Sequence, residues 1–197
     1  MSPQYVKPYV KGNKNDSNDA EAICEAVSRP HMRFVAVKSV VQQDLQMLHR
    51  VRERCIKART VLGNQIRGLL SEYGIVLPTG IHRLRQALPQ LVETETLTPL
   101  GREVFTQLYE ELVTIDQQIE TCEQRITRWF KSDPTCQRLA QVDGIGPLTA
   151  PAFVAAVANP AAFKNGRQVS AWLGLVPRQA STGGKPVFLG ISNRGDC

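Results

Sequence analysis

Two long stretches of the chain carry apolar residues at alternating spacings of three and four, the pattern of helices that pack along a coiled-coil seam. The spacing predicts one helix from near Ser39 to Tyr73 and a second from about Leu100 to Lys131. A connector over 78–99, punctuated by Pro78, Gly80, Pro89 and Pro99, joins them, so we expect an antiparallel helical hairpin. The seam positions are Val41, Leu45, Leu48, Cys55, Leu62, Ile66, Leu69 and Tyr73 in the first helix, with Arg52 and Arg59 interrupting, and Val104, Leu108, Leu112, Ile115, Ile119, Cys122, Ile126 and Trp129 in the second.

The polar faces of the two predicted helices carry opposite charges. The first is rich in arginine and lysine, and the second is acidic in its middle. These cations can pair with the acids of the second helix, or they can contact the phosphates of DNA or RNA. The sequence leaves both interpretations open, together with a role of the hairpin in dimerisation. The residues are Arg50, Arg52, Arg54, Lys57, Arg59 and Arg67 in the first helix and Glu110, Glu111, Asp116, Glu120 and Glu123 in the second.

After Pro134, the segment LAQVDGIGPLTAPAFVAAVA predicts two short helices separated by a glycine turn. This is the pattern of a helix-hairpin-helix motif, with Gly144 and Gly146 on either side of Ile145. Glycines let the backbone amides face outward, and the next helix adds its partial positive charge. Such a turn binds a DNA phosphate without reading sequence. The alternative is a plain tight connection between helices, but the match on both flanks favours DNA-backbone binding.

A short helix over 167–173, with Trp172 and Leu173 as core residues, leads to a polar loop near the end of the chain. The loop combines hydroxyls, cations and glycine: Arg178, Ser181, Thr182, Gly184, Lys185 and, further on, Arg194. A hydroxyl that attacks a phosphodiester needs cations to stabilise the charge that develops, and the loop offers three. By itself the loop is weak evidence for catalysis, because Ser-Thr-Gly-Gly segments are often turns and the phosphate-binding pattern GxxxxGK[ST] is absent.

The first 15 residues are predicted to be extended or irregular, because Pro3 and Pro8 interrupt helices while nearby tyrosines and valines suit a strand. A helix follows through DAEAICEAV, capped by Asn15, Asp16 or Ser17, and a strand-like run covers 32–37. Asp16 and Asp19, three positions apart, project from one side of the helix entrance. Two such carboxylates can ligate a divalent metal; the short pattern alone favours capping and dipole complementation instead.

Composition narrows the class of protein. The chain has 197 residues, 42% hydrophobic and 21% charged, as in ordinary globular proteins. Its five cysteines are scattered without a CxxC pair, which argues for free thiols in a reducing compartment and against a zinc site. We see neither a secretory signal nor an apolar run that could span a bilayer, so we expect a cytoplasmic protein. A net charge of +6 favours a polyanionic partner.

Four segments in order resemble one family: KNDSNDAEAI, QQDLQMLHRVRERCIKARTVLGNQIRGLL, VDGIGPLTA and WLGLVPRQASTGGKPVFLGISNRGD. They are similar to bacterial insertion-sequence transposases related to the Piv-type DNA invertases. The resemblance implies a RuvC-like domain with a DEDD carboxylate set, a coiled-coil hairpin, and a C-terminal domain with a nucleophilic serine. Asp16 and Asp19 match the last two acids of the set, which hold Mg²⁺. Ser181 matches the serine that links to DNA, although Thr182 stands where relatives often have serine, so which hydroxyl attacks stays open.

The resemblance also implies a guide RNA from the element's own non-coding end and assembly as a dimer or tetramer. The family's first Asp and its Glu lie upstream of the Lys-Asn-Asp motif, and relatives continue beyond GISNRGDC. We therefore expect a fragment truncated at both ends, without recombinase activity of its own. The alternatives are a non-catalytic nucleic-acid-binding module and a helical hairpin that only oligomerises.

The expected fold is mainly α: a RuvC-like α/β remnant over 1–37, a coiled-coil hairpin over 38–133, and a helical C-terminal domain with the helix-hairpin-helix motif and serine loop over 134–197.

Overall fold

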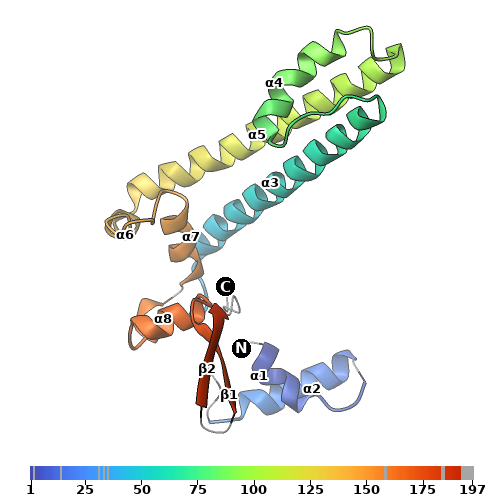
Figure 1. Ribbon diagram of the computed structural model, residues 1–197. Coiled ribbons are helices and arrows are strands. Elements are labelled where there is room, and N and C mark those ends of the chain that lie inside the picture. Colours follow the sequence, from blue (N-terminus) through green and yellow to red (C-terminus); the bar gives the residue numbers. More distant parts are fainter. Residues whose placement is uncertain are drawn as a thin grey trace. The chain divides into compact units, whose positions relative to one another are not determined.

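The computed structural model describes residues 1, 3–13, 15–30, 32, 34, 36–157, 159–182 and 185–191. Their contacts form two compact units, one of Val40–Ala156 and the other of Met1–Ser39 with Val157–Cys197 (Figure 1). Helices dominate both units, as predicted for a mainly α protein. The domain boundaries expected from the sequence divide the chain differently and stay a prediction.

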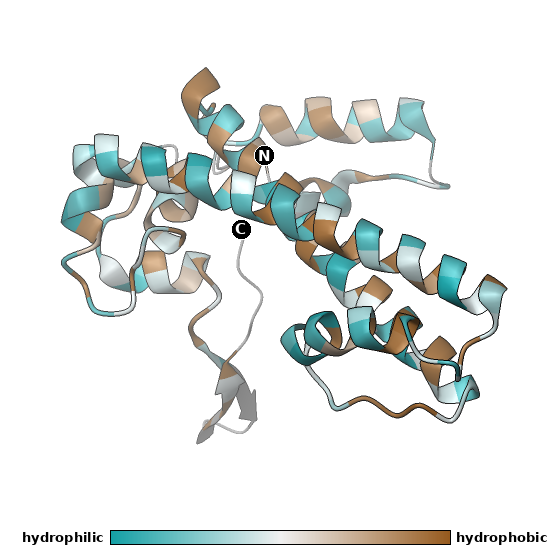
Figure 2. Ribbon diagram, turned by 90° about the horizontal axis from the view of Figure 1, so that it is seen from above, coloured by the Kyte–Doolittle hydropathy of each residue, from teal (hydrophilic) through white to brown (hydrophobic). Residues whose placement is uncertain are grey.

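A hairpin of two long helices, α3 (Val40–Glu72) and α5 (Pro99–Ser132), forms the larger unit. The ion pairs show that the helices run antiparallel. Arg52 of α3 pairs with Glu123 of α5, and Arg59, later in α3, pairs with Asp116, earlier in α5. Helix α5 begins at Pro99, and the Thr98 hydroxyl accepts a hydrogen bond from the Gly101 amide at 3.1 Å. Brown apolar and teal polar positions alternate along both helices in Figure 2. The predicted hairpin is confirmed; supercoiling as a coiled coil stays a prediction.

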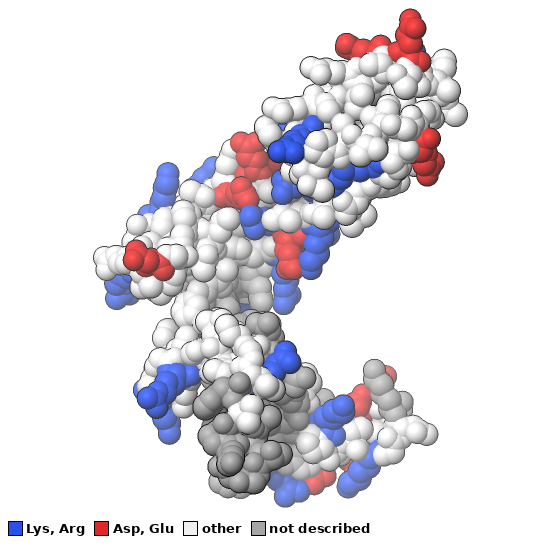
Figure 3. All heavy atoms as spheres, viewed as in Figure 1, with Lys and Arg blue, Asp and Glu red and all other residues white. Residues whose placement is uncertain are grey.

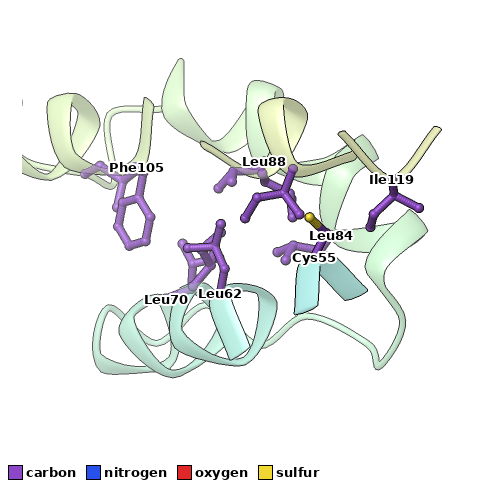
Figure 4. Close-up of a cluster of buried hydrophobic side chains, with 11 residues drawn as sticks. Cys55, Leu62, Leu70, Leu84, Leu88, Phe105 and Ile119 are labelled. Atoms are coloured by element: carbon purple, nitrogen blue, oxygen red, sulfur yellow. The ribbon is translucent and has the colours of Figure 1, made fainter. Parts of the chain in front are cut away.

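The core lies between α3, α5 and a shorter helix, α4 (Ile81–Val92), which the sequence placed in a looser connector (Figure 4). Leu84 and Leu88 of α4 are fully buried and cover the seam near the tip of the hairpin. The seam predictions hold in the middle and are wrong at the ends: Val41, Tyr73 and Val104 are exposed, at 56%, 41% and 38%. Neighbours at the tip, Leu70 and Phe105, are buried instead.

One carboxylate joins all three helices of this core. Asp116 Oδ1 of α5 lies 3.1 Å from Arg59 Nη1 of α3, and Oδ2 lies 2.9 Å from Arg85 Nη1 of α4. The Asp116 side chain is only 15% exposed, so these bonds are partly shielded from water. The network fixes the position of α4 across the hairpin.

Two short helices, α6 (Pro134–Leu139) and α7 (Thr149–Ala156), complete the larger unit. Asp133 caps α6 by accepting a hydrogen bond from the Cys136 amide at 2.7 Å. Helix α7 packs on α3 and α5, and Gln42 Nε2 donates to the Val154 carbonyl at 3.1 Å. The turn between α6 and α7 is therefore held on the end of the hairpin where α3 begins.

The N-terminal part of the smaller unit holds α1 (Pro3–Val6), the 3₁₀ turn η1 (Lys7–Tyr9) and α2 (Asp16–Val27). The extended or irregular segment predicted for the first 15 residues is wrong over 3–9, which are helical. The prolines stand in the first turns of α1 and η1, where a missing N–H costs nothing, so they start these elements rather than interrupt them. The described residues of 32–37 contain no strand.

The C-terminal part of the smaller unit holds η2 (Pro160–Ala162), α8 (Gly166–Trp172) and an antiparallel pair of strands, β1 (Pro177–Thr182) and β2 (Lys185–Ile191). The predicted helix over 167–173 is confirmed, and the ring of Trp172 stands edge-on to Phe163 at 5.7 Å. The polar segment expected to be a loop in a helical domain is instead a β-hairpin. None of the described helices is long and apolar enough to cross a membrane.

The Asp116 network yields a prediction about stability. Asp116→Ala leaves Arg59 and Arg85 without their shared partner, so we expect the free energy of unfolding to fall by about 1–3 kcal/mol. Glu111→Ala, at an exposed position of the same helix, is the control and should change it by less than about 0.5 kcal/mol. Urea denaturation followed by circular dichroism measures both. Equal effects of the two substitutions would show that the network contributes nothing.

The thiols yield a prediction about reactivity. Burial, with the nearby charge of Asp133 as the next cause, raises the pKa of Cys136 to about 12. At pH 8 only about one Cys136 in ten thousand is the reactive thiolate. Iodoacetamide should therefore alkylate exposed Cys24 and leave Cys136 unmodified in the folded chain, as read by peptide mass spectrometry. Similar labelling rates at the two positions would contradict the buried placement of Cys136.

Candidate nucleic-acid interface

The glycine turn between α6 and α7 has the geometry of a backbone-amide site. Gly144 lies at φ +87°, in the left-handed region that favours glycine, and it is exposed to solvent. The turn is closed by hydrogen bonds on both sides, from the Ile145 amide to the Val142 carbonyl and from the Ala150 amide to the Gly146 carbonyl, each at 3.0 Å. The turn is thus a fixed structure and not a slack connection.

Two amides of this turn are available to a ligand. Within the described part of the chain, the N–H groups of Gly144 and Gly146 donate to no protein acceptor. A Cβ atom built on either glycine would meet no atom within 4 Å, so the space beside the backbone is open. Gly146 does not adopt a positive φ. The backbone conformation at position 146 therefore does not require glycine. The absence of a side chain there leaves room for a ligand to approach the backbone closely.

The start of α7 adds to the positive potential of this turn. The helix begins at Thr149, and the first amides of a helix carry a partial positive charge. The nearest cation along the chain is exposed Arg138 in α6. Together, free amides and a helix start suit a phosphate group, whose oxygens accept several hydrogen bonds at once.

The structure divides the basic residues of α3 into two groups. Arg52 and Arg59 pair with Glu123 and Asp116, at 2.6 Å and 3.1 Å, so these two arginines hold the hairpin together. Arg50 and Arg54 are exposed on another side of α3. On the face shown in Figure 3, basic and acidic side chains are interspersed along the larger unit. Pairing with the acids of α5 therefore accounts for Arg52 and Arg59, and nucleic-acid contact by Arg50 and Arg54 stays a prediction.

Asp16 and Asp19 lie together in the first turn of α2. The cap is Asn15, whose Oδ1 accepts from the Asn18 amide at 2.7 Å, so neither Asp16 nor Ser17 is the capping residue. Asp16 is exposed and Asp19 is partly buried. Both carboxylates complement the helix dipole, and neither of them caps the helix.

These two carboxylates do not make a metal site by themselves. Among the described residues, no group of three or more His, Cys, Asp and Glu side chains is placed to hold an ion. A divalent cation that acts on a phosphodiester takes several oxygen ligands from its site. The described residues therefore do not fit a complete metal site.

The predicted serine site falls on the β-hairpin. Ser181 pairs with Pro186 and Thr182 with Lys185 in the backbone register, next to the connection between the strands. The side chains of Ser181, Thr182 and Lys185 lie outside the described part of the structure, as do Gly184 and Arg194 entirely. Arg178, in β1, is described and exposed. The roles assigned to these residues stay predictions.

The β-hairpin itself is the feature that sequence reasoning missed. Its signal is present: Val187, Leu189 and Ile191 alternate along one strand, which is the period of a β-strand. A Gly-Gly pair precedes them, a strong signal for a two-residue hairpin connection. The hydroxyl, glycine and lysine residues of the same segment are equally typical of a polar loop, so the local sequence is ambiguous.

Two protein-family models match the chain. One is described as a transposase of the IS116/IS110/IS902 family and matches residues 136–197, and the other, a DEDD transposase model of the IS110 type, matches residues 1–75. The first covers the glycine turn and the β-hairpin, and the second covers α2 and the whole of α3.

Curated relatives agree with these matches. A probable family 20 transposase of Pseudomonas aeruginosa is 48% identical across the whole chain, which covers 59% of that protein. The transposase for insertion sequence element IS1111A of Coxiella burnetii is 48% identical, with 54% of its length covered. The transposase for IS1328 of Yersinia enterocolitica is 41% identical, with 58% covered. The chain spans little more than half the length of these relatives. On the order and identity of the matched segments, the chain belongs to the IS110/IS116/IS902 family of insertion-sequence transposases.

Proposed function

We propose that this chain is a DNA-binding part of an insertion-sequence transposase, and that the turn at Gly144, Ile145 and Gly146 contacts a DNA phosphate. The observation that carries the proposal is the pair of glycine amides without protein acceptors, beside open space and the start of α7. The contact is sequence-independent, because it involves only backbone groups and a phosphate. The motif acts as a helix-hairpin-helix. We also propose that Arg178, Lys185 and Arg194 contact DNA.

In the whole transposase, we propose that Ser181 or Thr182 attacks the DNA phosphodiester, as in the Piv-type recombinases that the sequence resembles. Asp16 and Asp19 would supply two carboxylates of a RuvC-like DEDD site for a divalent ion, with Mg²⁺ as the expected ion. A guide RNA would direct the enzyme, which would work as a dimer or tetramer in the bacterial cytoplasm. The support is the family membership and the shared first turn of the two carboxylates on α2.

The alternative function is that of a non-catalytic module that binds nucleic acid and oligomerises. It is favoured for the isolated chain by the missing third metal ligand among the described residues. The two proposals are compatible, since the same chain can bind DNA alone and take part in chemistry only within a complete enzyme.

The phosphate contact predicts the effect of a single substitution. Gly146→Leu fills the open space beside the turn without requiring a new backbone conformation, so the chain should fold while the phosphate is excluded. We expect the Kd for a short DNA duplex to rise about ten-fold or more, the loss of one or two charge-assisted hydrogen bonds. Fluorescence anisotropy at low salt measures it, with circular dichroism as the check on folding.

The control for this experiment is Gly68→Leu, at an exposed position of α3 where an added Cβ also meets no atom within 4 Å. It should leave the Kd unchanged. Binding by the unmodified chain should weaken steeply between 50 and 200 mM salt, because phosphate contacts release counterions. An unchanged Kd for a folded Gly146→Leu chain would contradict the role of the turn.

The incomplete carboxylate set predicts that the isolated chain does not cut DNA. With Mg²⁺, the DNA ends of the cognate element and its RNA, a nicking and strand-exchange assay should give no product above background. Asp16→Asn should leave that background unchanged, because the described residues hold no complete metal site to lose. Robust turnover that Asp16→Asn abolishes would refute the prediction and show that two carboxylates of this chain do take part in a working site.

A further inference from the structure

Helix α3 carries a second apolar stripe that the hairpin does not use. Val40, Met47 and Val51 are 71%, 59% and 39% exposed, although each is a large hydrophobic residue. With Asp44 and Arg54 they follow spacings of four and three residues along the helix, the pattern of a packing seam. We call these five residues, from Val40 to Arg54, the outer stripe.

The outer stripe lies beside the core face and not opposite to it. Its members immediately precede seam positions: Asp44 precedes buried Leu45, and Arg54 precedes buried Cys55. One residue turns a helix by about 100°, so the stripe faces sideways while the core face contacts α5. The surface over its middle is hollowed, and the hollow is lined by Asp44, Met47, Val51 and Arg54 among others. This face can receive another helix without disturbing the hairpin.

The outer stripe is complementary to the same stripe of a second copy that runs in the opposite direction. Met47 and Val51 are equidistant from His49 along the chain, as are Asp44 and Arg54. In an antiparallel pair of α3 helices centred on His49, Met47 of one copy therefore meets Val51 of the other. Asp44 meets Arg54 in the same arrangement, twice, because the axis is two-fold. Apolar residues face apolar residues and opposite charges face each other.

A parallel pair of the same helices has the opposite electrostatics. It would place Asp44 against Asp44 and Arg54 against Arg54, and like charges facing each other at a seam are destabilising. A nucleic acid suits the stripe poorly as well, since the stripe holds three large apolar side chains and a carboxylate and only one cation, Arg54. Arg50 lies at the edge of the seam near the axis, where its long side chain can extend into solvent.

We propose that the outer stripe of α3 is a homodimer seam whose occupant is the same stripe of a second copy, antiparallel and centred on His49. The paired positions from Asp44 to Arg54 would span about 15 Å along the helix, at 1.5 Å per residue. This inference rests on the self-association in the proposed function and names its surface. It does not depend on DNA binding, which uses the glycine turn.

Sedimentation equilibrium of the full 197-residue chain without nucleic acid tests the seam. We expect a dimer. Asp44→Arg and Arg54→Asp should each raise the dissociation constant about ten-fold or more, because each puts like charges face to face. The double variant restores opposite charges across an antiparallel seam, so its dissociation constant should return to within about three-fold of the original. In a parallel seam the double variant restores nothing, so only the antiparallel arrangement predicts rescue.

A matched pair of substitutions tests the apolar part of the stripe. Val51→Asp places a charge next to the axis and should make the chain monomeric. Val61→Asp is the control: Val61 is 66% exposed on the same helix, but its symmetry mate falls before α3 begins at Val40. A monomeric unmodified chain would refute both the seam and self-association. A dimer that tolerates Val51→Asp, or a charge swap without rescue, would refute the seam alone. Variants that weaken DNA binding while the dimer persists would assign the stripe to nucleic acid and overturn the proposal.

Discussion

The buried seam between α3 and α5 is the interaction on which the larger unit depends. Neither helix could hold its apolar stripe in water alone, and packing the two stripes together removes both from solvent. Helix α4 closes the tip with Leu84 and Leu88, and Asp116 fixes it in place through Arg59 and Arg85. The charges that line this seam are thus part of the scaffold, and they are not available to a ligand.

That scaffold determines where the glycine turn stands. Helix α7 packs on α3 and α5, and Gln42 reaches the Val154 carbonyl, so the turn before α7 is fixed relative to the hairpin. A backbone amide binds phosphate well only if it is held in place beforehand, since ordering a loose turn would cost conformational entropy. The hairpin holds this turn rigid, and the N–H groups of Gly144 and Gly146, which have no protein acceptor, can bind a ligand.

Sequence reasoning succeeded where one physical signal dominated. Helical periodicity placed α3 and α5 to within about a residue of their ends, because long amphipathic helices have strong, redundant patterns. It was wrong where a residue had two possible roles. Pro3 and Pro8 can break a helix or start one, and the outcome depends on neighbours that the local pattern does not contain. The arginines of α3 were ambiguous for the same reason, since only the fold decides which of them face Glu123 and Asp116. The glycine turn was predictable as a turn, but its free amides were visible only in the hydrogen-bond pattern.

The most direct test of this account follows individual amides while DNA is added. In ¹⁵N-labelled protein titrated with a short duplex at low salt, the amide resonances of Gly144 and Gly146 should shift progressively, and added salt should reverse the shifts. The amide resonances of residues in the middle of the hairpin, such as Ile115, should not shift, because these amides lie within helix α5 and the Ile115 side chain is buried. If DNA bound and shifted other resonances while Gly144 and Gly146 stayed unchanged, the phosphate would be held elsewhere and the central claim would be wrong.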